Sequence, residues 1–265
     1  MAEIESLRAR MRARRAPGGL LAGAAYHLWA LVMLKRAPRL WRYVLIPILV
    51  NIVVGATVYL GLLLIGMRAI DGVVAGLPGW AAALGGLLHV LLVIGLLLAT
   101  GFVLARFGVV LGSPWYAKLS EDLEQLRTGQ APPAEPLSAA GIMRDLTRAL
   151  LFELKKLLLV IAVGLLLLLL NLVPAVGTLL AAFGWIALGA TIACLDFLES
   201  PLERRRLRFC ARLGLIRRSL PASAGFGLVC LGLISIPFVN LLAIPLCVTA
   251  GTLFFCDQIW PDMPA

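Results

Sequence analysis

The chain has 265 residues, of which 61% are hydrophobic and only 14% charged, and its mean hydropathy is +0.97. This composition excludes a soluble globular protein and predicts one membrane domain over residues 1–265, because no segment is polar enough to fold separately. The net charge of +10 is also compatible with nucleic-acid binding, but no recognised nucleic-acid motif is present and the basic residues flank apolar segments. Membrane orientation accounts for them better, so no nucleic-acid partner is expected.

The N-terminal region combines a basic tail with an apolar run. Residues 1–16 contain five arginines and are expected to be flexible. The run 18–34 imitates the core of a signal peptide, but it leads straight into Lys35 and Arg36 without a small-residue cleavage site. Its histidine and tryptophan favour a retained helix at the membrane interface over a cleaved signal or a spanning helix.

Two segments are long enough to cross the membrane completely. Tyr43–Ile65 has about 23 residues, or roughly 35 Å of helix, with Pro47 in its first turns, where proline does least damage. Trp80–Ala105 is the second predicted span. Asn51 is a lone amide in the first span, expected to be satisfied by a neighbouring helix, and it is a candidate pathway residue.

A longer apolar stretch, 157–198, is broken in its middle. It contains no charge before Asp196, and Asn171 and Pro174 interrupt it. The arm before the break, 157–172, is only about 24 Å long as a helix, short of a hydrocarbon core of roughly 30 Å. We therefore predict a hairpin that enters the membrane, turns at depth and returns to the same side.

Residues 225–256 repeat this design. Pro237 and Asn240 lie near the middle, and the arm before Pro237 has about 12 residues. Two broken apolar segments in corresponding places are typical of a transport pathway, so the tips of both hairpins are candidate pathway residues. The alternative is two membrane helices with ordinary proline kinks.

Amphipathic helices are expected to connect these segments. One is predicted to begin at Ser113-Pro114, a second to run from Ala139 through Lys155-Lys156 into the first hairpin, and a third to begin at Ser200-Pro201. The third is predicted to bury Leu207, Cys210, Leu213, Ile216 and Leu220 opposite a row of arginines. Residues 203–218 are then expected to be solvated or to lie on anionic lipid headgroups.

The basic residues predict the topology. Nine of the 24 Lys and Arg lie in residues 1–42, seven in 106–156 and seven in 199–224, which leaves only Arg68 elsewhere. If each broken segment returns to its own side, the three basic regions share one side of the membrane. The positive-inside rule then predicts a multi-pass membrane protein with both termini in the cytoplasm.

Catalytic chemistry is not indicated. The chain has no P-loop, H-E-x-x-H or G-x-S-x-G motif and only two histidines, so neither an ATP site nor an enzyme is expected. The five cysteines form no C-x-x-C pair and are interpreted as small core residues, with no metal site and no cofactor.

The candidate binding groups favour an anion path. Arg39 and Arg42 precede the first span, where an exposed helix start adds partial positive charge, although snorkelling and orientation alone would also explain them. Asp196 and Asp257, at the exits of the two hairpins, are candidates for carrying a coupled proton, but they are also ordinary helix-end residues.

Several segments of the chain resemble a known family. Residues 41–51 (WRYVLIPILVN) are similar to the opening span of the CysZ sulfate permeases, which belong with the eukaryotic etoposide-induced ER proteins. The similarity recurs in order at 113–124, 128–129, 141–145, 174–177 and 236–240, and at Pro245 and Gly251.

The resemblance implies sulfate uptake for cysteine biosynthesis. It also implies an oligomer, here a homo-oligomer, in which each chain has two spanning helices plus two partly inserted hairpins. Of the family's basic pair before the first span, Arg42 matches one member, and Trp41 stands in the place of the other.

The leading hypothesis is therefore an inner-membrane permease for a small oxyanion, with sulfate as the expected ion. A non-transporting membrane scaffold of the same superfamily and an oligomeric ion channel are the alternatives.

Overall fold

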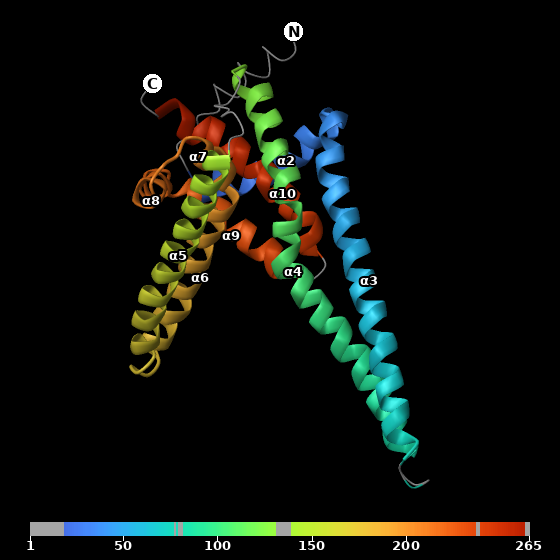
Figure 1. The fold of residues 1–265 in the computed structure, drawn as a ribbon. Helices are drawn as coiled ribbons and strands as arrows, with labels where there is room; N and C mark the ends of the chain where they lie inside the picture. Colours follow the sequence, from blue (N-terminus) through green and yellow to red (C-terminus); the bar gives the residue numbers. More distant parts are fainter. Residues whose placement is uncertain (1–18, 77, 79–81, 131–138, 237–238, 263–265) are drawn as a thin grey trace.

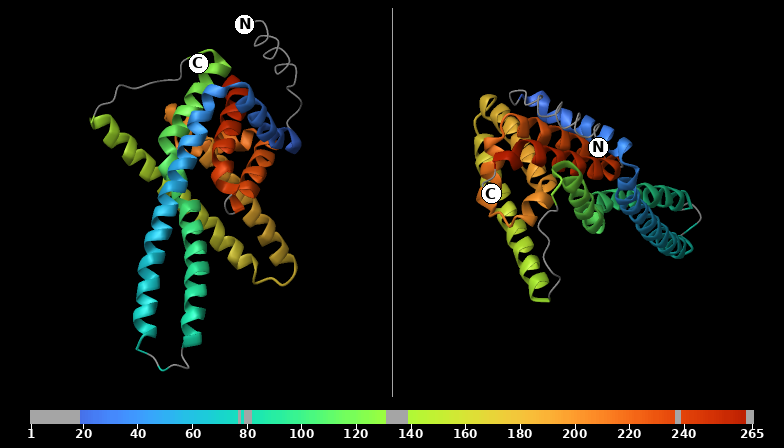
Figure 2. Two further views of the ribbon diagram at one scale, coloured as in Figure 1. Left: turned by 90° about the vertical axis from the view of Figure 1, so that its right-hand side faces the viewer. Right: turned by 90° about the horizontal axis from the view of Figure 1, so that it is seen from above.

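The computed structural model describes residues 19–76, 78, 82–130, 139–236 and 239–262. The described residues are almost entirely helical and contain no strand, which confirms the prediction of an all-α membrane protein. Figures 1 and 2 show two helical arms that diverge from a common head, in which the described residues begin and end. The predicted basic tail at 1–16, the tip residue Pro237 and the start of the second span at Trp80 lie outside the described residues.

The helices differ widely in length. In chain order they are α2 (Leu20–Arg36), η1 (Pro38–Leu40), α3 (Trp41–Val74), α4 (Ala82–Thr128), α5 (Ala139–Leu170), α6 (Val176–Phe197), α7 (Glu199–Arg204), α8 (Phe209–Arg218), α9 (Ala222–Ser235), α10 (Val239–Phe254), the π turn η3 (Phe255–Ile259) and η4 (Trp260–Asp262).

The longer arm is the antiparallel pair α3 and α4 (Figure 1). Both predicted spans lie in it, but α3 continues beyond Ile65 to Val74. The prediction that a new helix begins at Ser113-Pro114 is wrong, because α4 runs unbroken through Pro114 to Thr128. Proline removes only one helical hydrogen bond, and the Tyr116 side chain closes back over Gly112, where a Cβ would lie 2.4 Å from the ring.

The shorter arm is the hairpin of α5 and α6. The predicted break is confirmed at residues 171–175, where Ala175 has a φ of 61° and the chain reverses. As expected, α5 runs without interruption through Lys155 and Lys156 into the hairpin.

The second broken segment forms α9 and α10, which lie in the head. Most of α10 is buried, and its residues form the centre of the hydrophobic core together with residues of α2, α4, α6 and α9. The end of α9 at Ser235 and the start of α10 at Val239 confirm the predicted break, although α10 is covered by the protein's own helices along most of its length.

The predicted single helix from Ser200 to Leu220 is wrong. The chain forms α7 and α8, separated by a turn in which Arg206 adopts the left-handed conformation with a φ of 53°. Cys210 and Leu220 are exposed, whereas Arg212 is buried, so the predicted inward face is also wrong at these positions. The turn arises where Arg204 and Arg205 bend toward a carboxylate on α4.

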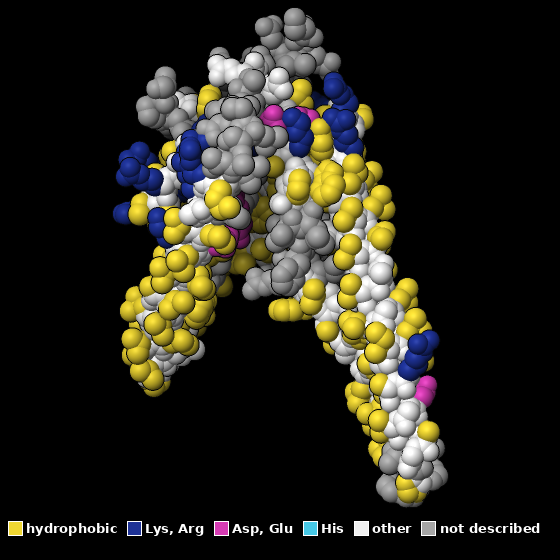
Figure 3. Space-filling view, viewed as in Figure 1, with side chains coloured by type: hydrophobic (Ala, Val, Ile, Leu, Met, Phe, Trp, Pro, Cys, Tyr) yellow, Lys and Arg dark blue, Asp and Glu magenta, His cyan; other side chains and the backbone are white. Residues whose placement is uncertain are grey.

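Within the described residues, four helical segments are long and apolar enough to cross a membrane: 38–74, 84–103, 176–197 and 239–259. Hydrophobic side chains cover both arms in Figure 3, and most of the visible Lys and Arg side chains gather on the head. How deeply each hairpin enters the membrane stays a prediction.

Helix α2 packs closely against α9 through two glycines. A Cβ on Gly23 would lie 1.7 Å from the Ala222 carbonyl oxygen, and a Cβ on Gly225 would lie 1.8 Å from the Leu20 carbonyl oxygen. These neighbours are backbone atoms, so no rotamer change relieves the overlap. The crossing therefore requires glycine on both helices.

We expect Gly23→Ala to destabilise the protein by about 2 kcal/mol or more, because α2 has to move away from α9. Thermal unfolding in detergent measures the effect. The control is Gly61→Ala in α3, where nothing lies within 4 Å of the added methyl group. It should be neutral, or stabilising by up to about 1 kcal/mol. Equal melting temperatures for the two variants would contradict the close crossing.

Candidate anion site

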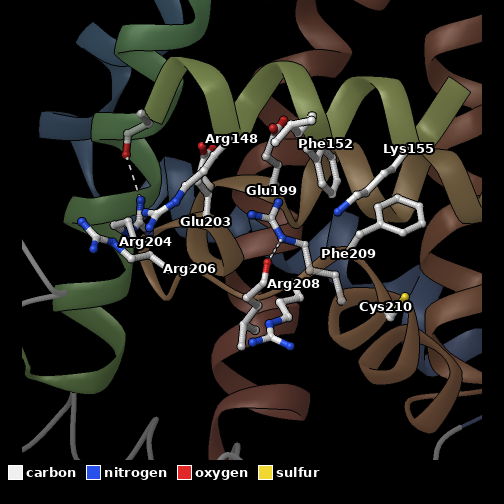
Figure 4. A pocket seen from close by; sticks show the side chains of 15 residues that line it. Arg148, Phe152, Lys155, Glu199, Glu203, Arg204, Arg206, Arg208, Phe209 and Cys210 are labelled. Atoms are coloured by element: carbon white, nitrogen blue, oxygen red, sulfur yellow. Dashed lines mark hydrogen bonds between the residues drawn. The ribbon is translucent and has the colours of Figure 1, made fainter. Parts of the chain in front are cut away.

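A cavity of about 760 Å³ opens in the head between α5, α7 and α8. Six basic and two acidic side chains line it, and we call it the basic cavity (Figure 4). Because two like-signed groups at close range repel one another, so many cations around one space favour an anion inside it. The lining residues are Ala117, Arg148, Leu151, Phe152, Lys155, Glu199, Ser200, Glu203, Arg204, Arg206, Leu207, Arg208, Phe209, Cys210 and Arg212.

Helix α5 supplies one wall. Arg148, Phe152 and Lys155 follow one another at spacings of four and three residues, so they share one face of the helix. Figure 4 shows them projecting from α5 toward the residues of α7 and α8. Phe152 is buried and meets the Phe209 ring edge-on at 5.5 Å. This aromatic contact fixes the distance between the two walls.

Arg212 is the most deeply buried cation of the cavity, with 5% of its surface exposed. Its guanidinium lies 4.4 Å from the centre of the Phe152 ring, and its Nε donates to the Leu207 carbonyl oxygen at 3.1 Å. Within the described residues, its buried Nη1 has no hydrogen-bond partner. An unsatisfied buried N–H of a guanidinium costs free energy, and an oxyanion in the cavity would remove that cost.

Glu124 of α4 anchors the second wall. Its side chain is 2% exposed and accepts hydrogen bonds from Arg204, at 2.8 Å, and from Arg205. The Arg205 guanidinium packs against both Phe255 and Trp260, at 4.5 Å and 4.2 Å from their ring centres. One carboxylate thus holds two guanidiniums, and the cluster retains an excess positive charge next to the cavity.

Glu199 faces this cationic space. Burial, followed by the nearby Glu203 charge, raises the pKa of Glu199 to about 7, although Lys156 and Arg212 act in the opposite direction. The carboxyl group therefore changes its charge near neutral pH, and with it the net charge of the cavity.

The predicted pair Arg39 and Arg42 lies elsewhere. Arg39 is in η1 and Arg42 in the first turn of α3, both exposed, and α3 and α8 lie at opposite sides of Figure 1. The Arg42 guanidinium lies 4.6 Å from the centre of the Tyr43 ring. The structure does not bring this pair into the basic cavity.

The predicted pathway residues are also dispersed. Asn51 is buried in α3 and Asn240 at the start of α10, whereas Asn171 and Pro174 are exposed at the tip of the α5–α6 hairpin. The four do not form one cluster.

Both predicted proton carriers form ion pairs. Asp196 accepts from Lys156 at 2.7 Å and thereby joins α6 to α5. Asp257 accepts three hydrogen bonds from Arg127 at 2.7–3.0 Å and joins η3 to α4. Both side chains therefore link one helix to another.

Sequence reasoning missed the basic cavity and Glu124. The density of basic residues in 106–156 and 199–224 could have indicated a cation-lined site. We interpreted these residues instead as determinants of membrane orientation and as contacts with lipid headgroups. Helix period alone placed Arg212 on a solvated face, although the structure buries it.

Comparison with known proteins gives one consistent family. The family described as Sulfate transporter CysZ/Etoposide-induced protein 2.4 matches residues 26–245. The "Sulfate transporter CysZ" of Salmonella typhimurium is 28% identical over 229 residues, which cover 86% of this chain and 88% of the relative. The proteins of the same name from Pectobacterium atrosepticum and Vibrio cholerae are 26% and 28% identical, over 88% and 83% of this chain and 82% and 88% of theirs.

We expect Glu124→Gln to destabilise the fold by about 3–5 kcal/mol, because it leaves two partly buried guanidiniums without a counter-charge. Thermal unfolding in detergent measures this loss. The matched control is Glu121→Gln one turn earlier, which removes an exposed partner of Lys118. That pair should be worth about 1 kcal/mol or less. A similar small loss in both variants would show that the buried cluster is not an anchor.

Proposed function

Because this chain belongs to the family described as Sulfate transporter CysZ/Etoposide-induced protein 2.4, we propose that it is a membrane permease for a small oxyanion, with sulfate as the ion. The observation that carries the proposal is the buried Arg212 guanidinium, which lines the basic cavity with an unsatisfied donor. The relatives' names supply the choice of sulfate. Uptake for cysteine biosynthesis is the role that follows from that family.

The chemistry of the basic cavity suits a hydrated divalent anion. Five of its six cations are arginines, whose planar guanidiniums offer paired donors to the oxygens of a tetrahedral anion. A volume of about 760 Å³ leaves room for water around the ion. Partial hydration keeps binding weak enough for release, as conduction requires.

Entry and exit involve further groups in this proposal. Arg39 and Arg42, exposed at the start of α3, would attract anions at the membrane surface. Asn51 and Asn240 would line the path between the helices, with Asn171, Pro174 and Pro237 at the hairpin tips. The exposed Arg217 and Arg218 of α8 would lie on anionic lipid headgroups.

The chain is a multi-pass membrane protein, and we propose that it lies in the bacterial inner membrane with both termini in the cytoplasm. Support comes from the gathering of basic side chains on the head (Figure 3), in which the described residues begin and end. The basic cavity would then be a cytoplasmic vestibule. We also propose a homo-oligomer, in which subunit contacts would cover the exposed hairpin tip at 171–174. The N–H groups of residues 171–173 already donate within the tip, so these contacts would be made mainly by side chains.

Inward movement of a divalent anion needs a driving force. Against a negative interior of 100 mV, it costs about 4.6 kcal/mol. An inward concentration gradient or a co-transported cation has to supply this energy. Among the acidic groups Glu199 is better placed to carry a proton than Asp196 or Asp257, because it lines the cavity itself.

Arg212→Gln should weaken sulfate binding and uptake by roughly 10–100-fold. This factor corresponds to the loss of one hydrogen bond to a charged group, which contributes about 1.5–3 kcal/mol. Uptake of radiolabelled sulfate into proteoliposomes and equilibrium binding in detergent measure the two effects. The matched control is Arg144→Gln, an exposed arginine of α5 outside the cavity, which should behave like the wild type.

Size-exclusion chromatography tests whether the Arg212→Gln variant remains folded. Wild-type uptake no greater than that of empty vesicles would refute the permease and favour a scaffold role. Uptake that falls with Arg42→Ala but not with Arg212→Gln would move the site to the start of α3.

Sulfate binding should strengthen as the pH falls through about 7, the pKa of Glu199. Above that pH the ionised carboxylate neutralises part of the cationic cavity, and below it the neutral acid leaves the arginines to the anion. Conversely, bound sulfate should raise the pKa of Glu199, so that a proton is taken up with the anion.

The measurement is the sulfate dissociation constant between about pH 6 and pH 8. Glu199→Gln should bind tightly throughout and lose the dependence. Glu153→Gln, an exposed acid of α5 outside the cavity, should keep it. A wild-type affinity that is independent of pH would contradict the assignment to Glu199.

A further inference from the structure

Three metal-ligating side chains meet in the core of the head, away from the basic cavity. They are His27 of α2, Cys230 of α9 and Cys247 of α10, and their ligand atoms all lie within 4.8 Å of one another. All three are buried, with exposed fractions of 4%, 0% and 0%. Three separate helices thus point one nitrogen and two sulfur atoms at one place.

The histidine is oriented as a ligand. Its Nδ1 lies 3.3 Å from the Ala24 carbonyl oxygen, which can only accept, so the proton resides on Nδ1. Nε2 then presents its lone pair toward Cys230 Sγ, 3.2 Å away. The ring also stacks on Phe226 at 5.2 Å between centroids. A backbone carbonyl that fixes the tautomer behind the metal-facing nitrogen is the usual support of a histidine ligand.

We propose that His27, Cys230 and Cys247 bind a divalent soft metal ion of the zinc type. The charge argument selects the ion: two thiolates and a neutral imidazole around a divalent cation sum to zero, which a buried apolar site tolerates best. A monovalent copper ion would leave a net negative charge. Binding releases the two thiol protons to solvent, and no oxidant or reductant takes part.

The geometry needs little adjustment. Bonds of about 2.3 Å to sulfur and 2.0 Å to nitrogen place tetrahedral ligand atoms about 3.5–3.8 Å apart. Side-chain shifts of about an ångström therefore convert the observed cluster into a coordination sphere. Three protein ligands leave one position of the ion open.

The metal would pin α2 to α9 and α10, the helices that form the hydrophobic core of the head. Because the ligands come from opposite ends of the sequence, the ion would close the chain on itself. Its role would be structural and independent of the anion path.

The experiment uses the full chain, purified in detergent under reducing conditions and loaded with zinc or cobalt before dialysis. Elemental analysis should find about one zinc per chain. The cobalt-loaded protein should show a thiolate-to-cobalt charge-transfer band and a melting temperature above that of the metal-free protein.

Cys230→Ala and Cys247→Ala should each lose the band and the bound zinc, because each removes one thiolate ligand. Both variants should still fold, because alanine is small and apolar and suits the buried positions. The matched control is Cys210→Ala, the exposed cysteine of α8, which should keep both signals.

The wild-type protein alone tests the proposal, even if a variant fails to fold. Absence of metal and of the band in the reduced, monodisperse protein would overturn the proposal. So would a disulfide between Cys230 and Cys247 in protein handled without air, or a band that persists in both single variants.

Discussion

The buried carboxylate of Glu124 is the constraint on which the head depends. A charge in such surroundings is tolerable only with a counter-charge, and here two guanidiniums supply it. Because Arg204 and Arg205 are adjacent in the chain, α7 has to end where both can reach α4, and the turn at Arg206 follows. That turn sets α8 against α5 and so creates the basic cavity. The same contact draws Phe255 and Trp260 over Arg205 and holds the C-terminal segment in place.

Local features of the sequence predicted the two arms correctly. Long apolar runs produced α3 and α4, and the Asn171–Pro174 interruption produced the turn between α5 and α6, because both effects act within a few residues. Prediction was wrong where side-chain packing, local or distant, overrides the preference of the backbone. Pro114 reads as a helix start, yet Tyr116 packs over Gly112 and the helix continues. Residues 200–220 read as one amphipathic helix, yet a carboxylate about 80 positions earlier in the chain divides it.

The candidate site was harder to predict than the fold. Arg39 and Arg42 were visible because they are close together in the sequence and precede a span. The cavity residues come from α4, α5, α7, α8 and the turn between the last two, and a face argument on one helix assigns Arg212 to solvent. Similarly, His27 and Cys230 are 203 positions apart, so no spacing rule could join them. In each case the sequence contains the right residue types, but only the packing of the helices shows which of them lie together.

The unbroken helix α4 has a mechanical consequence. Its 47 residues correspond to about 70 Å of helix, one end of which lies at the far tip of the longer arm with α3. The other end bears Glu124 and Arg127, which bind the basic turn and the C-terminal segment. The helix contains Pro114 and bends along its length (Figures 1 and 2), but no loop interrupts it. The longer arm is therefore joined to the head through one continuous helix, so the arm cannot swing away from the head without bending that helix further.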